Sequence, residues 1–195
     1  MTETSRPATL DSLTATAKQA ASKGLPPVHL WNPDYCGEID MRIASDGSWH
    51  YLGTPIGRPA LVKLFSTILR KDPERYVLVT PVERVGIIVD DAPFIAVAMD
   101  RHEQNGKQRL EFRTNVDDHV VAGPDHPMRV APDVKGGLKP YVHVRADLWA
   151  KVSRPVFYDL VALGEERMID DKKMFGIASD GAFFPMIEAD RLADL

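Results

Sequence analysis

The fold is decided at residues 45–69, which read SDGSWHYLGTPIGRPALVKLFSTIL. The dipeptide Asp46-Gly47 predicts a two-residue hairpin turn, because a type I′ turn needs positive φ and glycine adopts it without steric cost. Apolar residues at every second position predict the incoming strand at 38–44, so that Trp49 lies on the return strand. Pro59 suits the first turn of the following helix, where its missing N–H is not needed.

The same order recurs near residue 150, which predicts a duplicated unit. Trp149 matches Trp49, and Arg154-Pro155 matches Arg58-Pro59 before a second apolar helix. We expect both helices to pack through apolar stripes at helical spacing. The expected stripes are Leu61, Leu64 and Phe65 in the first copy and Phe157, Leu160 and Val161 in the second.

The repeat continues past the helices. Gly86-Ile87 and Asp90-Asp91 match Gly176-Ile177 and Asp180-Gly181, with a phenylalanine soon after each turn. Each copy is therefore expected to end in a closing hairpin at its aspartate turn. The spacing between matched residues shortens along the repeat, as changes in loop length between two copies would produce.

The remaining segments complete an α+β chain of two β-rich domains and an N-terminal helical arm. Residues 9–22 favour a helix that ends near Gly24 and either docks on something larger or stays mobile. Asn105-Gly106 predicts another hairpin. The expected domains are the arm at 1–23, the first repeat domain at 24–92 and a larger domain with the second repeat at 93–195.

Composition narrows the classes of function. The formal net charge is −4, so we expect no extended nucleic-acid partner, which would need a basic surface. The single cysteine, Cys36, excludes an internal disulfide and favours a reducing compartment. The polar start lacks a secretory signal, and the longest apolar stretch, 92–99, is too short to span a bilayer. We therefore expect a cytoplasmic protein with no membrane association.

The charge is uneven along the chain. Between residues 129 and 154, six cations stand against Asp133 and Asp147. One interpretation is a solvated face; the other is a patch that binds a small anion. The cations are Arg129, Lys135, Lys139, Arg145, Lys151 and Arg154.

Motifs for catalysis or metal binding are absent. No Cys-x-x-Cys, His-Glu-x-x-His or Gly-x-Ser-x-Gly pattern occurs. The nearest metal candidate is 117–119 together with Asp125-His126, which also suits two polar loop ends. Adjacent aspartates are typical of turns, where their side chains bond the local backbone. We expect no metal, no cofactor and no enzymatic activity.

Two helix starts are candidate anion sites. The N-terminus of a helix presents free N–H groups and the positive end of the helix dipole. Arg58 and Arg154 stand at what the repeat predicts to be the same helix-entry position. The alternative is structural, with each arginine bonded to a neighbouring carbonyl or carboxylate.

The strongest candidate binding residues lie between the two copies, where a cleft between domains would form. The stretch 112–118 offers a cation, an amide and carboxylates, and strand alternation predicts that Arg145 points away from the core and joins them. Arginine could hold a phosphate while the amide and carboxylates contact a ribose or base. The alternative is an interdomain ion pair between Arg113 and Asp117. The candidates are Arg113, Asn115, Asp117, Asp118 and Arg145.

Several separated blocks resemble the bacterial family of domains of unknown function numbered 1285, over about 28–186. They are Ile43-x-x-Asp46-Gly47-x-Trp49-x-Tyr51-x-Gly53-x-Pro55-Ile56, Val62-x-Leu64-Phe65, Leu78-Val79-Thr80-Pro81-Val82-Glu83, Phe112-Arg113-Thr114-Asn115-Val116-Asp117-Asp118 and Pro140-Tyr141-Val142-x-Val144-Arg145. The resemblance implies a duplicated core and a C-terminal half superficially like pleckstrin-homology folds. It also implies a role in signal transduction, with a nucleotide-like ligand at the domain interface.

The leading hypothesis is a small cytoplasmic ligand-binding or signalling module for a nucleotide-like or other anionic ligand. One alternative is an enzyme with a dispersed site, such as Asp117, Asp118 and His126, acting on a phosphorylated or nucleotide substrate. Another is an adaptor that binds a protein partner. Fold alone does not choose among them.

Overall fold

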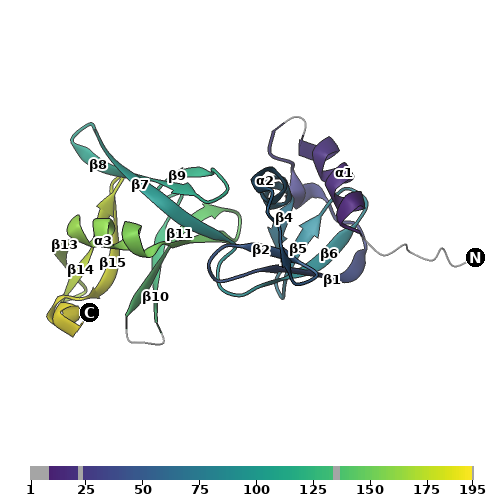
Figure 1. The fold of residues 1–195 in the computed structure, drawn as a ribbon. Helices are drawn as coiled ribbons and strands as arrows, with labels where there is room; N and C mark the ends of the chain where they lie inside the picture. Colours follow the sequence, from purple (N-terminus) through teal and green to yellow (C-terminus); the bar gives the residue numbers. More distant parts are fainter. Residues whose placement is uncertain (1–8, 22–23, 134–136, 195) are drawn as a thin grey trace, which may run out of the picture. The chain divides into compact units, whose positions relative to one another are not determined.

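The computed structural model describes residues 9–21, 24–133 and 137–194. The chain forms two compact units, Met1–Pro93 and Phe94–Leu195. Each unit is rich in strands (Figure 1). Within the described residues, no helix is long and apolar enough to cross a bilayer.

The N-terminal unit is built on a six-stranded sheet with the order β3-β2-β1-β6-β5-β4. The central strands β1 and β6 are parallel, and the other neighbours are antiparallel. The strands are β1 (Tyr35–Ile43), β2 (Trp49–Tyr51), β3 (Thr54–Pro55), β4 (Leu69–Lys71), β5 (Tyr76–Val79) and β6 (Arg84–Val89), and a short 3₁₀ helix, η2, spans Val28–Leu30.

The predicted hairpin joins β1 to β2, but through a longer loop than a two-residue turn. Ala44 and Ser48 still pair, because the Ala44 N–H donates to the Ser48 carbonyl at 2.9 Å. The Gly47 N–H donates to the Ala44 carbonyl, and within this loop only Gly47 has a positive φ, at 84°. This is a three-residue loop with glycine in the left-handed position, the next commonest hairpin connection.

Two α-helices lie in the described part of this unit. Helix α1 (Leu10–Ala20) begins with a capping box between Thr9 and Ser12. It contacts α2 (Pro59–Thr67) and buries Leu13 and Ala17 completely, so the predicted arm is docked. Burial against α2 is what stabilises a helix with so thin an apolar stripe.

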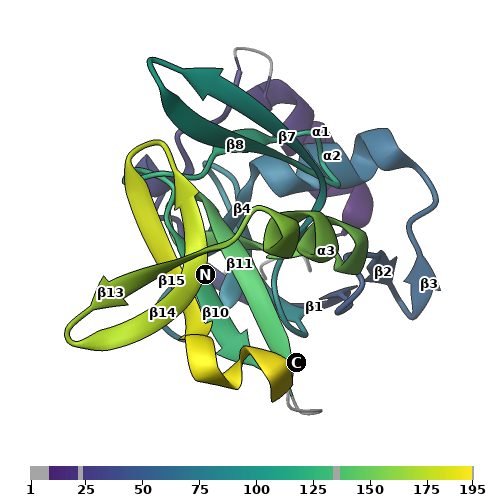
Figure 2. The same cartoon turned by 90° about the vertical axis from the view of Figure 1, so that its left-hand side faces the viewer.

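The C-terminal unit has a six-stranded sheet in the order β10-β11-β12-β7-β8-β9 and a three-stranded sheet, β13-β14-β15 (Figure 2). The predicted turn at Asn105-Gly106 is confirmed: it joins β7 to β8, and both residues have positive φ, 54° and 71°. The strands are β7 (Phe94–Gln104), β8 (Lys107–Thr114), β9 (His119–Val121), β10 (Met128–Pro132), β11 (Leu138–Arg145), β12 (Leu148–Val152), β13 (Glu165–Ile169), β14 (Lys172–Ser179) and β15 (Ala182–Glu188); the helices are α3 (Arg154–Ala162) and the 3₁₀ helix η3 (Ala189–Asp194).

The duplicated units fit the structure at the level of element order. The first unit contains the hairpin β1–β2, helix α2 and the antiparallel strands β4, β5 and β6. The second contains the hairpin β11–β12, helix α3 and the antiparallel strands β13, β14 and β15. A hairpin, a helix and a three-stranded meander therefore recur in the same sequence order.

The tryptophan match is wrong in detail. Trp49 is 2% exposed and stacks on Phe65 with ring centroids 6.4 Å apart. Trp149 is only half-buried, and its neighbour Leu148 is the one that is 2% exposed. Because successive strand residues point to opposite faces, the two tryptophans lie on opposite faces of their hairpins.

The helix stripes are displaced by one residue for a related reason. The N-cap of α2 is Arg58, whereas that of α3 is Ser153, so α3 begins one residue earlier relative to its Arg-Pro pair. The buried pair of α2, Leu61 and Phe65, therefore corresponds to Val156 and Leu160. Phe157, which the match placed in the core, is half-buried.

One closing hairpin exists and the other does not. Asp180-Gly181 turns β14 into β15, as predicted. Asp90-Asp91 instead leads from β6 into β7, which belong to different sheets and different units. The stretch 90–93 is therefore the junction between the units, and the apparent sequence repeat at this point does not reflect a repeated structure.

Candidate functional site

Arg113 and Asp117, the first pair of predicted site residues, face each other across the turn after β8. Arg113 Nη1 lies 3.7 Å from Asp117 Oδ1, and the side chains are 44% and 58% exposed. Both residues belong to the C-terminal unit, so the alternative of an interdomain pair is wrong. Asp117 has a φ of 62°, as a turn aspartate can.

Asn115 serves the backbone of β7. Its Oδ1 accepts a hydrogen bond from the Ile95 N–H at 3.0 Å, and its own N–H donates to the Ile95 carbonyl at 2.8 Å. These two bonds hold the start of β7 against the turn. The amide oxygen that sequence reasoning assigned to a ligand is thus bonded within the fold.

Arg145 does not point away from the core. A register irregularity between His143 and Arg145 places Arg145 opposite the buried Leu148. Its guanidinium bonds Asp118 and lies 4.9 Å from the ring centroid of Phe94. Both members of the ion pair have side chains only 22% exposed. A β-bulge overturns the prediction, because one extra residue reverses strand alternation.

The two helix-entry arginines lie in different units and at different helix positions. Arg58 is the N-cap of α2, is exposed, and makes no capping hydrogen bond through its side chain. Arg154 is the first residue of α3, and its Nε donates to the Tyr158 hydroxyl at 3.0 Å. That bond raises the pKa of the Arg154 guanidinium. Arg154 therefore fits the alternative in which the arginine is bonded within the fold, although its acceptor is a hydroxyl and not a carbonyl or carboxylate.

The candidate acid and base groups are also engaged. Asp118 accepts from Arg145, and Asp117 faces Arg113. The His126 Nδ1 lies 3.2 Å from the His143 carbonyl oxygen. Over the described ranges, no group of three or more His, Cys, Asp or Glu side chains is arranged to hold a metal ion.

The Arg113–Asp117 pair leads to a prediction about stability. Arg113→Ala should change the free energy of unfolding by less than about 1 kcal/mol, because exposed ion pairs contribute ~0 to 1 kcal/mol. Urea denaturation of the variant and the wild type would measure this. A much larger loss would mean that the pair is buried in the folded protein.

A different surface gathers cationic and aromatic side chains on one face of β10, β11 and β12. Register pairs place Arg129 opposite Tyr141 and Tyr141 opposite Lys151. His143 stands opposite Trp149 in the next row. Directly opposed residues share a face of a sheet. We call this surface the basic-aromatic face; it comprises Arg129, Lys139, Tyr141, His143, Trp149 and Lys151.

The other face of the same strands is apolar and buried. Val142, Ala150 and Val152 are at most 5% exposed, and helix α3 buries Val156 and Leu160 in the same unit. The alternation between the two faces is that of a half-buried sheet. On the basic-aromatic face Arg129 is exposed and most of the other side chains are half-buried, whereas Tyr141 is only 5% exposed.

Ring contacts hold the basic-aromatic face in place. The Arg129 guanidinium lies 4.6 Å from the Trp149 ring centroid and 5.1 Å from that of Tyr141. The His143 ring meets Trp149 edge-on at 5.2 Å. The Arg129 cation is thereby positioned by quadrupole attraction, which needs no carboxylate partner.

Charge on these strands has one sign. Strands β10, β11 and β12 contain no Asp or Glu, and Arg129, Lys139 and Lys151 stand on the basic-aromatic face. Lys135, also in the predicted patch, lies outside the described residues. Sequence reasoning found the charge cluster but missed the rings. The alternation of Tyr141 and His143 with apolar residues predicts that these two rings share a face of the strand.

The comparisons with known proteins cover almost the whole described chain. The N-terminal domain of the DUF1285 family, described as a domain of unknown function, matches residues 26–92. The C-terminal domain of the same family, described as a protein of unknown function, matches residues 93–186. The chain belongs to the DUF1285 family.

Two crystal structures of DUF1285 proteins resemble this one. The DUF1285 protein from Silicibacter pomeroyi DSS-3 is 53% identical, with 93% of this chain and 97% of that chain covered and a TM-score of 0.84. The one from Shewanella baltica OS155 is 29% identical, with 64% and 91% covered and a TM-score of 0.51. No curated protein matches the chain. The family resemblance of the sequence is thus confirmed, and the relatives' descriptions carry no activity.

Proposed function

We propose that this DUF1285 protein is a non-enzymatic ligand-binding module with a signalling role, and that its basic-aromatic face binds a nucleotide-like anion. One observation carries the proposal: Arg129, Lys139 and Lys151 share a face with Trp149 while the three strands contain no carboxylate. Such a surface would attract phosphate through its cations and a base through its rings.

The residues first predicted for the site support this proposal indirectly. Asp118 and Arg145 neutralise each other, and Asn115 is bonded to β7. The polar groups of these three residues are therefore engaged within the fold. The pleckstrin-homology likeness of the C-terminal half and the cytoplasmic location, both expected from the sequence, belong to the same proposal.

Calorimetric titration of the full protein with AMP, adenosine and inorganic phosphate tests the proposal. AMP should bind more tightly than either fragment, because it alone engages both rings and cations. Arg129→Ala should weaken AMP binding by ~1.5 to 3 kcal/mol, the scale of a hydrogen bond to a charged group.

Lys18→Ala is the matched control, because Lys18 is an exposed cation on α1 in the other unit. It should leave AMP binding unchanged. Equal weakening in both variants, or equal affinity for AMP and phosphate, would contradict a nucleotide site on this face. Tighter binding of a short single-stranded oligonucleotide than of AMP would instead indicate a nucleic-acid surface.

A further inference from the structure

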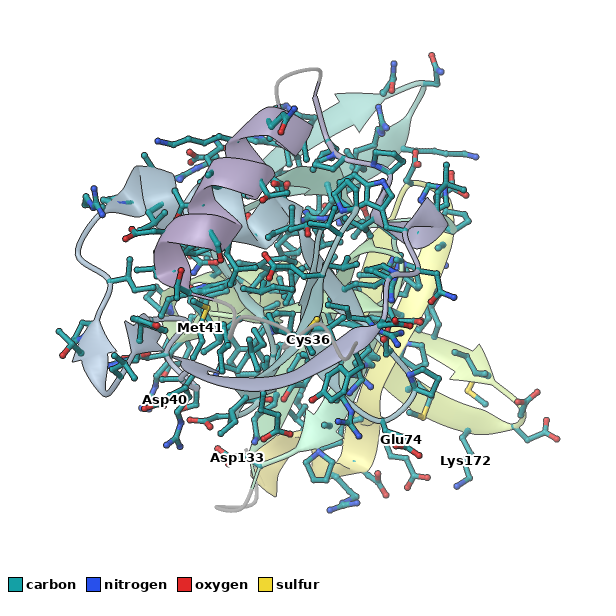
Figure 3. All side chains as sticks on the ribbon, turned by 90° about the vertical axis from the view of Figure 1, so that its right-hand side faces the viewer. Cys36, Asp40, Met41, Glu74, Asp133 and Lys172 are labelled. Atoms are coloured by element: carbon teal, nitrogen blue, oxygen red, sulfur yellow. The ribbon has the colours of Figure 1, made fainter. Side chains whose placement is uncertain are left out.

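A pocket of about 500 Å³ lies in the N-terminal unit, on residues that the proposed function does not use. It forms where the start of β1, the turn from β4 to β5 and the start of β6 come together. Its volume is in the range of small-molecule sites. The lining residues are Tyr35, Asp72, Pro73, Glu74, Arg75 and Arg84, of which Glu74 lies at the periphery of the ribbon in Figure 3.

Two arginines share one aspartate beside this pocket. Arg70 Nε lies 2.7 Å from Asp72 Oδ1, and Arg84 Nη1 lies 3.2 Å from Asp72 Oδ2. The side chains of Arg70, Asp72 and Arg84 are 14%, 18% and 24% exposed. One carboxylate thus compensates two largely buried guanidinium cations. A buried charge without a partner is costly, so the cluster favours a second anion.

The two arginines differ in how many of their donors are used. Arg70 also bonds Asp72 through Nη2, at 3.3 Å, and donates from Nη1 to the carbonyls of Val28 and Trp31, at 2.8 and 2.6 Å. It ties η2 to β4 and has a structural role. Arg84 makes one bond, and its buried Nε has no partner in the described part of the chain.

The unused donors of Arg84 have the geometry of a carboxylate site. Nε and Nη2 form one edge of the planar guanidinium, and their parallel N–H groups match the two oxygens of a carboxylate. Nη1, on the other side, is the atom held by Asp72. The aspartate therefore orients Arg84 and leaves its bidentate edge without an acceptor among the described residues.

An aromatic side chain, Tyr35, lines the same pocket as Arg84. Tyr35 pairs in register with Arg84, and the Arg75 guanidinium lies 4.8 Å from the Tyr35 ring centroid. A Cβ at Gly86 would come 2.6 Å from the Tyr35 hydroxyl, so a glycine there makes room for the end of the Tyr35 side chain. Tyr35 is 38% exposed, and Pro73 adds a second apolar surface.

We propose that this pocket binds a small carboxylic acid with a flat apolar body. The carboxylate accepts two hydrogen bonds from the Nε and Nη2 edge of Arg84. The apolar body packs against Tyr35 and Pro73. This site is separate from the basic-aromatic face and lies in the other unit. The two binding proposals can therefore be tested, and rejected, independently of each other.

The test is a titration of the ¹⁵N-labelled full protein with benzoate, observed at the Arg84 Nε–H signal. Benzamide, which has the same ring and no charge, is the first control ligand, and inorganic phosphate is the second. Benzoate should shift the Arg84 signal in a saturable way. Benzamide should shift it little, and phosphate should bind more weakly than benzoate.

Arg84→Lys is the informative variant, because lysine keeps the charge near Asp72 but lacks the bidentate edge. Benzoate affinity should fall about tenfold or more, as loss of a charge-assisted hydrogen bond predicts. Arg42→Lys, at an exposed arginine on β1 that pairs with Asp90, should bind benzoate as the wild type does.

An Arg84 signal that benzoate does not move in the wild-type protein would overturn the proposal, whether or not the variant folds. Equal benzoate affinity in Arg84→Lys would overturn it as well. Tighter binding of phosphate than of benzoate would show that the acceptor is not a carboxylate and would also reject it.

Discussion

Replacing Phe65 with alanine should lower the free energy of unfolding by about 3 to 5 kcal/mol, the usual loss for a buried phenylalanine. Phe65 is 0% exposed on α2 and stacks on Trp49, itself 2% exposed. Truncation removes the transfer free energy of the ring and leaves a cavity beside a tryptophan that cannot collapse freely. Urea denaturation followed by circular dichroism would measure the change.

Phe157→Ala provides the matched comparison from the second copy. Phe157 is half-buried, since α3 turns Val156 and Leu160 inward instead. The loss should therefore be clearly smaller than at Phe65. Equal losses at the two positions would contradict the one-residue displacement of the helix stripes between the units.

Replacing Ser179 with alanine should lower the free energy of unfolding by roughly 2 to 6 kcal/mol, because two buried polar groups lose their partner and each such loss costs about 1 to 3 kcal/mol. Ser179 is 1% exposed at the end of β14. Its hydroxyl donates to the Ala122 carbonyl at 2.7 Å and accepts from the Leu110 N–H at 2.9 Å. Alanine would leave both backbone groups without this partner inside the C-terminal unit.

The Ser179→Ala substitution should also loosen the backbone locally, in addition to lowering the free energy of unfolding of the protein. The neighbouring Asp180 N–H donates to the Gln108 carbonyl, and Gln108 Nε2 donates to the Ala178 carbonyl, both at 2.8 Å. These bonds join β14 to β8, so hydrogen exchange at Leu110 should accelerate in the variant. Ser153→Ala is the control, because the Ser153 side chain makes no capping bond. A stability loss no larger at Ser179 than at Ser153 would contradict the buried hydroxyl link.

The candidate site shows where sequence reasoning stops. The run of cations from Arg129 to Arg154 was visible in the sequence, and Arg129, Lys139 and Lys151 do share one face. Arg145, in the same run, is held inside by Asp118. Nothing in a list of charges separates these two outcomes, because the partner of Arg145 is 27 residues away.

The Arg84 pocket was missed for the same reason. Tyr35, Asp72 and Arg84 carry no motif and stand far apart in the sequence. The parallel pairing of β1 with β6 brings Tyr35 beside Arg84. A parallel pair needs a long connection, so its register cannot be found from a local turn signal.

The sequence by itself determined the local elements of this protein and the family to which it belongs. Glycines with positive φ form the turns at Gly47, Gly106 and Gly181. A proline stands in the first turn of α2 and of α3. Each of these residues shapes the backbone only within a few residues of its own position. Such steric preferences do not depend on the rest of the chain. The order of hairpin and helix in each copy was therefore predictable.

Only the tertiary structure decided which way the side chains of those elements point. The bulge before Arg145, the one-residue displacement of α3 and the assignment of β6 and β7 to different sheets each depend on partners distant in the sequence. A shift of one residue moves a strand side chain to the other face of the sheet, while the local preference of the segment for strand or helix hardly changes. Burial summed over distant neighbours selects between the two faces, and this is why Trp49 is a core residue while Trp149 belongs to the basic-aromatic face.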